Sequence, residues 1–163
     1  MRIGVGADHA GYLMKDQLAQ FLRDAKHEVT DFGTNGPVSV DYPDFAQAVG
    51  EALIAGKIDR GIVICGSGVG ATIAANKIPG IRACMCHDTY SAHQGVNHDN
   101  MNILVLGSRV IGPMLAQELV TNFLGANYWG HEKGQERLQR RLDKIEAIEK
   151  KYSLTARAEK GHA

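Results

Sequence analysis

The sequence predicts a doubly wound α/β fold, in which five parallel strands form one sheet and helices cover both of its faces. Short apolar runs alternate along the chain with stretches whose apolar side chains recur every three or four positions, as on one face of a helix. The runs are apolar on both faces, which is typical of strands buried within a parallel sheet. One run, residues 61–65, turns through glycines directly into helix-forming sequence, as in Rossmann-like and flavodoxin-like sheets.

The first part of the chain provides three strands, expected at residues 2–7, 29–32 and 61–65. Apolar side chains from Tyr12 onward mark one face of a helix that ends near Lys26. Asp44 is a good N-cap for a second helix, which stops at Gly56. The third helix follows the glycine loop and ends before Pro79.

The second part adds strands at residues 83–86 and 103–106 and a helix at residues 113–124. A charged helix is expected at residues 131–152, where four apolar side chains share one face: Leu138, Leu142, Ile145 and Ile148. A chain of 163 residues suits one domain. We expect this domain at residues 1–152, followed by a frayed polar tail at residues 153–163.

The composition limits the partners of this domain. The chain has 18 basic and 18 acidic residues, so capture of nucleic acid or of an anionic membrane is not expected. No apolar stretch approaches the roughly 20 residues that span a bilayer, and the N-terminal sequence lacks a signal-peptide core, so we expect a soluble, cytoplasmic protein. Cys65, Cys84 and Cys86 are odd in number, and the last two lie too close together to bridge comfortably, which argues against a disulfide framework.

The glycine loop after residues 61–65 carries the strongest chemical signal. Gly66, Gly68 and Gly70 let backbone N–H groups approach a ligand at a helix N-terminus, where negative charge is favoured. Cys65 ends the strand in the same field, so it should ionise more readily than an ordinary cysteine and act as a nucleophile or a base. The alternative is a buried cysteine beside a loop that only turns the chain.

Two further polar residues are expected beside this thiol. If the strand order is 2-1-3-4-5, the first and third strands are neighbours, and ligands bind beyond their carboxyl ends. Asp8 and His9 follow the first strand and would then converge on Cys65. A carboxylate, an imidazole and a thiol beside an anion-binding loop can transfer protons. The alternative for Asp8 is a simple helix cap.

Motifs along most of the chain resemble those of one family, the type B ribose-5-phosphate isomerases, which also contains the galactose-6-phosphate isomerase subunits. The resemblance covers residues from about 2 to about 150, with the motifs in order, and is far more specific than a single glycine loop. The motifs are Gly6-Ala-Asp-His-Ala-Gly11, Asp41-Tyr-Pro43, Cys65-Gly-Ser-Gly-Val-Gly70, Ile73-Ala-Ala-Asn-Lys77, Gly80-Ile-Arg-Ala83, Ser91-Ala92, Asn102 and Gly107-Ser-Arg-Val110.

The resemblance implies interconversion of an aldose phosphate and its ketose through an enediolate, without a metal or other cofactor. It makes Cys65 the base that moves the proton between C1 and C2. Ser67 and the backbone amides of Gly66, Gly68, Val69 and Gly70 would stabilise the enediolate oxygen, a role that oriented donors at a helix start also predict. The expected substrate is ribose 5-phosphate, and the alternatives are erythrulose 4-phosphate, allose 6-phosphate and galactose 6-phosphate.

The resemblance also assigns the sugar and phosphate contacts. His98 would help to open the furanose ring, and Asp8 would hold sugar hydroxyls. Several relatives have Asn where this chain has Asp99, and a carboxylate cannot donate as an amide does. Four cationic or imidazole side chains would meet the phosphate: His9, Arg109, Arg137 and Arg141. The alternatives are an exposed loop residue for His98 and a solvated charged helix face for the last two arginines.

Assembly and two rival functions complete the expectations. Relatives form dimers in which the last helix reaches the partner, so a homodimer or a dimer of dimers is expected, with Arg137 and Arg141 serving the neighbour's site. Gly66-x-Gly68-x-x-Ala71 with the later Asp88 also resembles a dinucleotide fingerprint, which would indicate a nicotinamide oxidoreductase. The third reading is a binding domain without enzymatic activity, on which the fold alone has no bearing.

Overall fold

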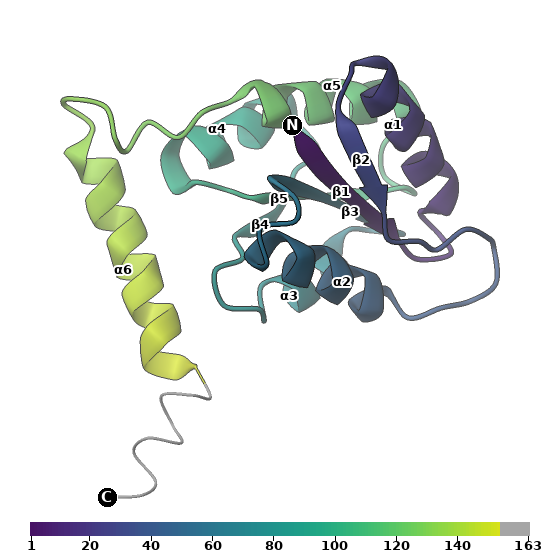
Figure 1. Cartoon of the computed structure of the whole chain (residues 1–163), viewed down its shortest axis with the longest axis horizontal. Coiled ribbons are helices and arrows are strands. Elements are labelled where there is room, and N and C mark those ends of the chain that lie inside the picture. The colour runs from purple at the N-terminus through teal and green to yellow at the C-terminus, as the bar shows by residue number, and fades with distance from the viewer. Residues whose placement is uncertain (154–163) are drawn as a thin grey trace, which may run out of the picture.

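The computed structural model describes residues 1–153, which form a five-stranded parallel sheet between two layers of helices (Figure 1). The strands are β1 (Arg2–Ala7), β2 (Glu28–Asp31), β3 (Arg60–Cys65), β4 (Ala83–Met85) and β5 (Ile103–Gly107). The helices within these residues are α1 (Tyr12–Asp24), α2 (Tyr42–Ile54), α3 (Val69–Ala75), α4 (Thr89–Asp99), α5 (Pro113–Gly125) and α6 (Glu136–Tyr152). The predicted α/β fold is confirmed.

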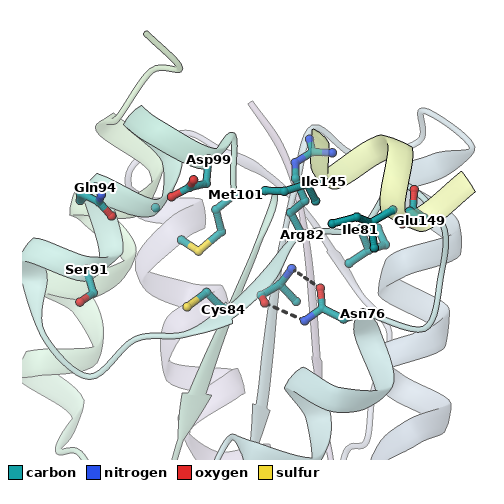
Figure 2. Close-up of a pocket in the computed structure, with 13 residues that line it drawn as sticks. Asn76, Ile81, Arg82, Cys84, Ser91, Gln94, Asp99, Met101, Ile145 and Glu149 are labelled. Atoms are coloured by element: carbon teal, nitrogen blue, oxygen red, sulfur yellow. Dashed lines mark hydrogen bonds between the residues drawn. The ribbon is translucent and has the colours of Figure 1, made fainter. Parts of the chain in front are cut away.

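The strand order is β2-β1-β3-β5-β4, so the expected order 2-1-3-4-5 is wrong for the last two strands. Every residue of β5 is buried, which suits a strand paired on both sides. The short β4 exposes Cys84 and Met85, as an edge strand can. Cys84 borders a cavity beside α6 (Figure 2). The pairing of β1 with β3 is as expected, with Ala7 opposite Ile64 at the end of the ladder.

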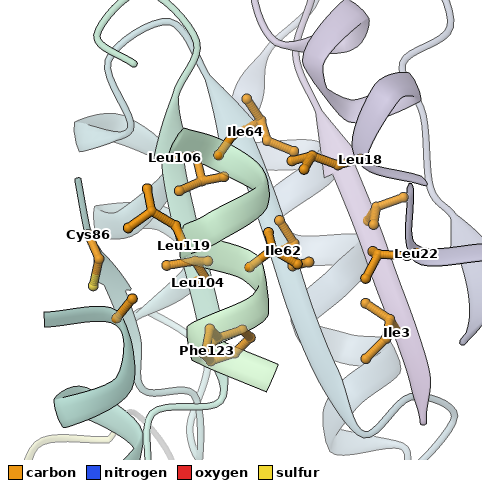
Figure 3. Close-up of a cluster of buried hydrophobic side chains, with 14 of the residues drawn as sticks. Ile3, Leu18, Leu22, Ile62, Ile64, Cys86, Leu104, Leu106, Leu119 and Phe123 are labelled. Carbon is orange, nitrogen blue, oxygen red and sulfur yellow. The ribbon is translucent and has the colours of Figure 1, made fainter. Parts of the chain in front are cut away.

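Alternate side chains of the strands fill two apolar layers, one on each face of the sheet. On the face covered by α1, α4 and α5, Ile62 and Ile64 pack with Leu18 and Phe123 (Figure 3). On the face covered by α2 and α3, Val63 and Cys65 belong to the second layer. Each fully buried aliphatic side chain contributes about 1.5–3 kcal/mol, so the carboxyl ends of the central strands are firmly fixed.

Two helix starts differ from the predictions. The second helix begins at Tyr42, with Asp41 at the N-cap, so Asp44 lies in its first turn rather than capping it. Pro43 explains this start, because proline fits the first positions of a helix. The last helix begins at Glu136 and not at residue 131. The preceding residues form two turns, in which the Glu132 and Gln135 amides donate to carbonyls three residues earlier.

The last helix, α6, is set apart from the layered body (Figure 1). Leu138 and Leu142 are buried and α6 contacts α4, whereas Ile145 and Ile148 are 43% and 60% exposed. The apolar face predicted on this helix is therefore only half covered by its own chain. Most of the expected polar tail, residues 154–163, lies outside the described residues. Within residues 1–153 no helix has the length and apolar character needed to cross a membrane.

Candidate active site

A cavity of about 370 Å³ opens at the carboxyl ends of β1 and β3. The Asp8 amide donates to the Ile64 carbonyl at 3.2 Å, so the loop after β1 begins directly beside the end of β3. The following loops of β1, β3 and β5 and the start of α2 form the walls. The lining residues are Asp8, His9, Ala10, Tyr42, Cys65, Gly66, Ser67, Gly70, Arg109 and Val110.

Cys65 is the last residue of β3 and is only 4% exposed. The Gly68 amide donates to its sulfur at 3.2 Å, so the glycine loop directs an N–H group at the thiol. Gly68 adopts a φ of 86°, a left-handed conformation that a side chain disfavours. This residue is therefore glycine for a local reason: it turns the chain from Cys65 into α3 with an amide facing the sulfur.

The loop after β5 holds the other two loops in place. The Ser108 hydroxyl donates to the carbonyls of Ala10, at 2.8 Å, and Cys65, at 3.2 Å. The Arg109 amide donates to the Gly66 carbonyl at 3.0 Å. Gly107 allows this approach, because a Cβ there would come within 2.5 Å of the Ser67 carbonyl oxygen. The role of Ser108 was not predicted, although its position directly after a buried strand at the same sheet edge was a signal.

Asp8 and His9 are both held by backbone groups. One carboxylate oxygen of Asp8 accepts from the Ala10 amide at 2.9 Å and from the Gly11 amide at 3.1 Å. The Asp8 side chain thus orders the loop before α1, and α1 has Gly11 at its N-cap. The Nδ1 atom of His9 lies 3.2 Å from the Val40 carbonyl oxygen and 3.3 Å from the Val40 amide nitrogen.

Several predicted site residues lie outside this cavity. Val69, at the start of α3, is half exposed. Gly68 does not line the cavity either, but its amide donates to the Cys65 sulfur. His98 lies in the last turn of α4, not in a loop, with its Nδ1 2.9 Å from the side-chain Nε2 of Gln94 and its ring beside Trp129. The remaining three are Asp99 on α4 and Arg137 and Arg141 on α6. One chain alone does not bring these side chains to Cys65.

Asp99 instead lines a second cavity, of about 560 Å³, between β4, α4 and α6. Figure 2 shows Cys84, Met101 and Ile145 around it. A hydrogen bond from the Cys86 thiol lowers the pKa of Cys84 to about 7, and the same interaction raises the pKa of Cys86. This second, mainly apolar cavity carries a thiol that was not predicted as a site residue.

The fold and the first cavity define a class of protein: an α/β enzyme for a small anionic ligand. The cavity lies where ligands bind in doubly wound sheets, outside the carboxyl ends of neighbouring central strands. It combines an acid, an imidazole, a thiol and a guanidinium with loop amides at a helix start. Such groups can hold a phosphate and move a proton.

Comparison with known proteins identifies the family. The family model described as Ribose/Galactose Isomerase matches residues 3–145, so the chain belongs to this family. The ribose-5-phosphate isomerase B of Escherichia coli (strain K12) is 43% identical over 150 residues, which cover 92% of this chain and 97% of that protein. The D-erythrulose-4-phosphate isomerase of Pectobacterium atrosepticum is 40% identical over 134 residues, covering 80% and 86%.

A solved structure agrees with this assignment. The ribose-5-phosphate isomerase B of Clostridium thermocellum shares 51% sequence identity and superposes with a TM-score of 0.89, over 94% of this chain and 100% of that chain. The family membership that the motifs predicted is therefore confirmed. These relatives are all named as isomerases, which leaves the nicotinamide oxidoreductase and the non-enzymatic binding domain without support from them.

Proposed function

We propose that the chain is an aldose–ketose isomerase that interconverts ribose 5-phosphate and ribulose 5-phosphate. The observation that carries the proposal is the Cys65 thiol, which faces the cavity while the Gly68 amide donates to its sulfur. Its family and the named activities of its relatives support the same reaction. The proposal takes residues 1–152 as a single isomerase domain, in keeping with the family match at residues 3–145.

Proton transfer follows from the groups around Cys65. With the sugar ring open, the thiolate removes the proton from C2, and the C–H electrons form the C1–C2 double bond of an enediolate. The negative charge on the C1 oxygen is stabilised by Ser67 and by the amides at the start of α3. The proton then returns from sulfur to C1, while the C2 hydroxyl passes its proton to the C1 oxygen, so that C2 carries the new carbonyl and C1 the new hydroxyl. These steps use protein groups alone.

Substrate binding assigns the rest of the cavity. Asp8 accepts hydrogen bonds from sugar hydroxyls near the ring oxygen. His9, in the loop after β1, and Arg109, in the loop after β5, bind the phosphate. A guanidinium can bind two phosphate oxygens at once. A volume of about 370 Å³ is at the small end of known ligand sites, which suits a short sugar phosphate.

A homodimer supplies what the cavity of one chain lacks. The exposed Ile145 and Ile148 of α6 need a covering surface, and a second copy of this chain provides it. In such a dimer α6 carries Arg137 and Arg141 to the partner's phosphate site, and α4 offers His98 for ring opening and Asp99 for sugar contacts. The two-fold symmetry then produces two equal composite sites. The cytoplasmic location expected from the sequence stays a prediction.

The test is a coupled assay that compares kcat/KM for ribose 5-phosphate, erythrulose 4-phosphate, allose 6-phosphate and galactose 6-phosphate. Ribose 5-phosphate should give the highest value. A clearly higher value for erythrulose 4-phosphate would replace the sugar and keep the mechanism. The 40% identical Pectobacterium isomerase makes this sugar the main competitor. Turnover of none of the four would contradict the proposed function.

A further inference from the structure

Lys15, on α1, is a lysine with no exposed side-chain surface, which is rare because a buried ammonium group must find partners for its charge. Its Nζ atom lies 2.5 Å from a carboxylate oxygen of Asp31 and 3.0 Å from one of Asp16. It also donates to the Asn35 side-chain oxygen at 3.2 Å. The ammonium group thus donates hydrogen bonds to Asp31 at the end of β2 and to Asn35 in the loop that follows, and it forms an ion pair with Asp16 on α1.

This loop, residues 33–41, connects β2 to α2 and is bound to the body at three points. Near its start, the Gly33 amide donates to Asp31 at 2.8 Å, and backbone hydrogen bonds of 2.7 Å join Ala7 to Gly33 and Thr34. Lys15 binds Asn35. Near the end of the loop, the backbone of Val40 meets the Nδ1 atom of His9.

The third contact links the loop to the proposed active-site cavity. Val40 contacts the Nδ1 atom of His9, and His9 lines that cavity. A histidine ring that binds an anion must present its other nitrogen, and the Val40 backbone at Nδ1 fixes the ring orientation, since it offers a carbonyl oxygen or an N–H group to either tautomer. Val40 can do this only while the loop keeps this position relative to His9. Lys15 is the one charged side chain, among the described residues, that joins α1 to both Asp31 and Asn35.

We propose that Lys15 is a positioning residue: through Asp31 and Asn35 it fixes the 33–41 loop, and through Val40 it sets the His9 ring for phosphate binding. This inference rests on the proposed function, in which His9 meets the substrate phosphate. Lys15 touches no substrate in this scheme. Its loss should therefore weaken phosphate binding and raise KM, while the proton transfer at Cys65 and hence kcat change little.

The experiment uses Lys15→Met, which keeps the length of the side chain without its charge, and Asn35→Ala, which leaves the Lys15–Asp31 pair intact. Asp16→Asn is the matched control, because Asp16 binds the same ammonium group but does not contact the loop. Each is made in the wild-type chain and with His9→Ala. KM and kcat are measured with ribose 5-phosphate, the dissociation constant of inorganic phosphate by calorimetry, and folding by circular dichroism.

Lys15→Met and Asn35→Ala should each raise KM and the phosphate dissociation constant by roughly 10-fold, the lower range found for groups that orient ligand-binding histidines in metal sites. The same changes should have almost no further effect when His9 is alanine, since residues that act through one group are non-additive. Asp16→Asn should leave both constants unchanged.

Equal fold-changes with and without His9 would overturn the inference and leave Lys15 with a role in stability alone. An unchanged KM and phosphate dissociation constant in Asn35→Ala would also overturn the inference. If Lys15→Met does not fold, Asn35→Ala alone tests the inference. Failure of the proposed function has a different signature, namely a wild-type chain that turns over no sugar phosphate. The phosphate dissociation constants then still decide whether Lys15 acts through His9.

Discussion

At the scale of single residues, the cysteines differ in what they present to a reagent. Cys84 is exposed, whereas Cys65 and Cys86 are buried. The Cys86 thiol lowers the pKa of Cys84 to about 7, so Cys84 ionises more readily at neutral pH than an ordinary cysteine. The thiolate is the form that reacts with alkylating agents.

Iodoacetamide at pH 7 should therefore modify Cys84 first, and the rate should rise with pH through about 7. Peptide mass spectrometry over a time course measures the order of modification. Substrate protection of Cys65 has to be measured in a Cys84→Ala chain, where ribose 5-phosphate should slow the alkylation of Cys65. Modification of Cys65 ahead of Cys84 in the wild-type chain would show that the two thiols have been assigned the wrong reactivities.

Part of the site could be predicted residue by residue from the sequence. Asp8, His9 and Cys65 could be brought together from the sequence because they end or follow β3 and β1, two strands that the parallel topology makes neighbours. The role of Ser108 in joining the loops was not predicted, since a serine after a strand has no distinctive spacing. The catalytic and binding roles assigned to these residues stay predictions. His98, Asp99, Arg137 and Arg141 lie away from this cavity in one chain. Arg137 and Arg141 were expected at a neighbour's site, and that expectation stays a prediction.

At the scale of elements, α4 depends on its N-cap, Asp88. The Ser91 amide donates to the Asp88 carboxylate at 2.7 Å, and this bond lowers the pKa of Asp88. Because the pKa is lower in the folded state, the stabilisation is complete above the ordinary value of about 3.9 and is lost as the pH falls through the folded pKa.

Asp88→Ala should therefore lower Tm at pH 7, because an unsatisfied N-terminal amide weakens the helix that carries His98. The difference from wild type should shrink in acid, as the pH falls below the ordinary value of about 3.9 and through the folded pKa. Asp88→Asn, which keeps an oxygen acceptor, should lose less. Thermal unfolding followed by circular dichroism measures both. A Tm difference that is equal at both pH values would mean that the charge of Asp88 does not stabilise α4.

Most strands and helices could be predicted from the sequence pattern, but the strand order and the start of α6 could not. Apolar runs located all five strands, because burial on both faces leaves a clear signal. The order of β4 and β5 was missed, since it depends on which of two apolar runs is more completely buried. The start of α6 was missed because charged and polar residues already begin at residues 131–135, while the backbone there forms turns.

At the scale of the whole molecule, the proposed dimer predicts complementation between two inactive chains. Cys65→Ala removes the base, and Arg137→Ala/Arg141→Ala removes the phosphate contacts that α6 carries to the partner. Each hybrid dimer then contains one site with neither defect. Random exchange makes half of the dimers hybrid, and half of their sites are intact, so activity should approach about a quarter of wild type.

Mixtures of the two chains at equal ratio, assayed after subunit exchange, measure this recovery. Native mass spectrometry provides the control by confirming that hybrid dimers have formed. Hybrid dimers without any recovered activity would place the two arginines at their own chain's site or outside both sites. A chain that remains monomeric would contradict the composite site itself.

The central claim is that Cys65 carries the proton between C2 and C1, and exchange at C2 tests it most directly. Ribose 5-phosphate is incubated in deuterium oxide with wild-type enzyme or with Cys65→Ser, and NMR follows deuterium at C2 together with ribulose 5-phosphate formation. We expect the variant to fold and to lose roughly 10²–10⁴-fold in both rates, the usual contribution of a general base. Exchange at C2 by Cys65→Ser at the wild-type rate would show that another group takes the proton and would contradict the account.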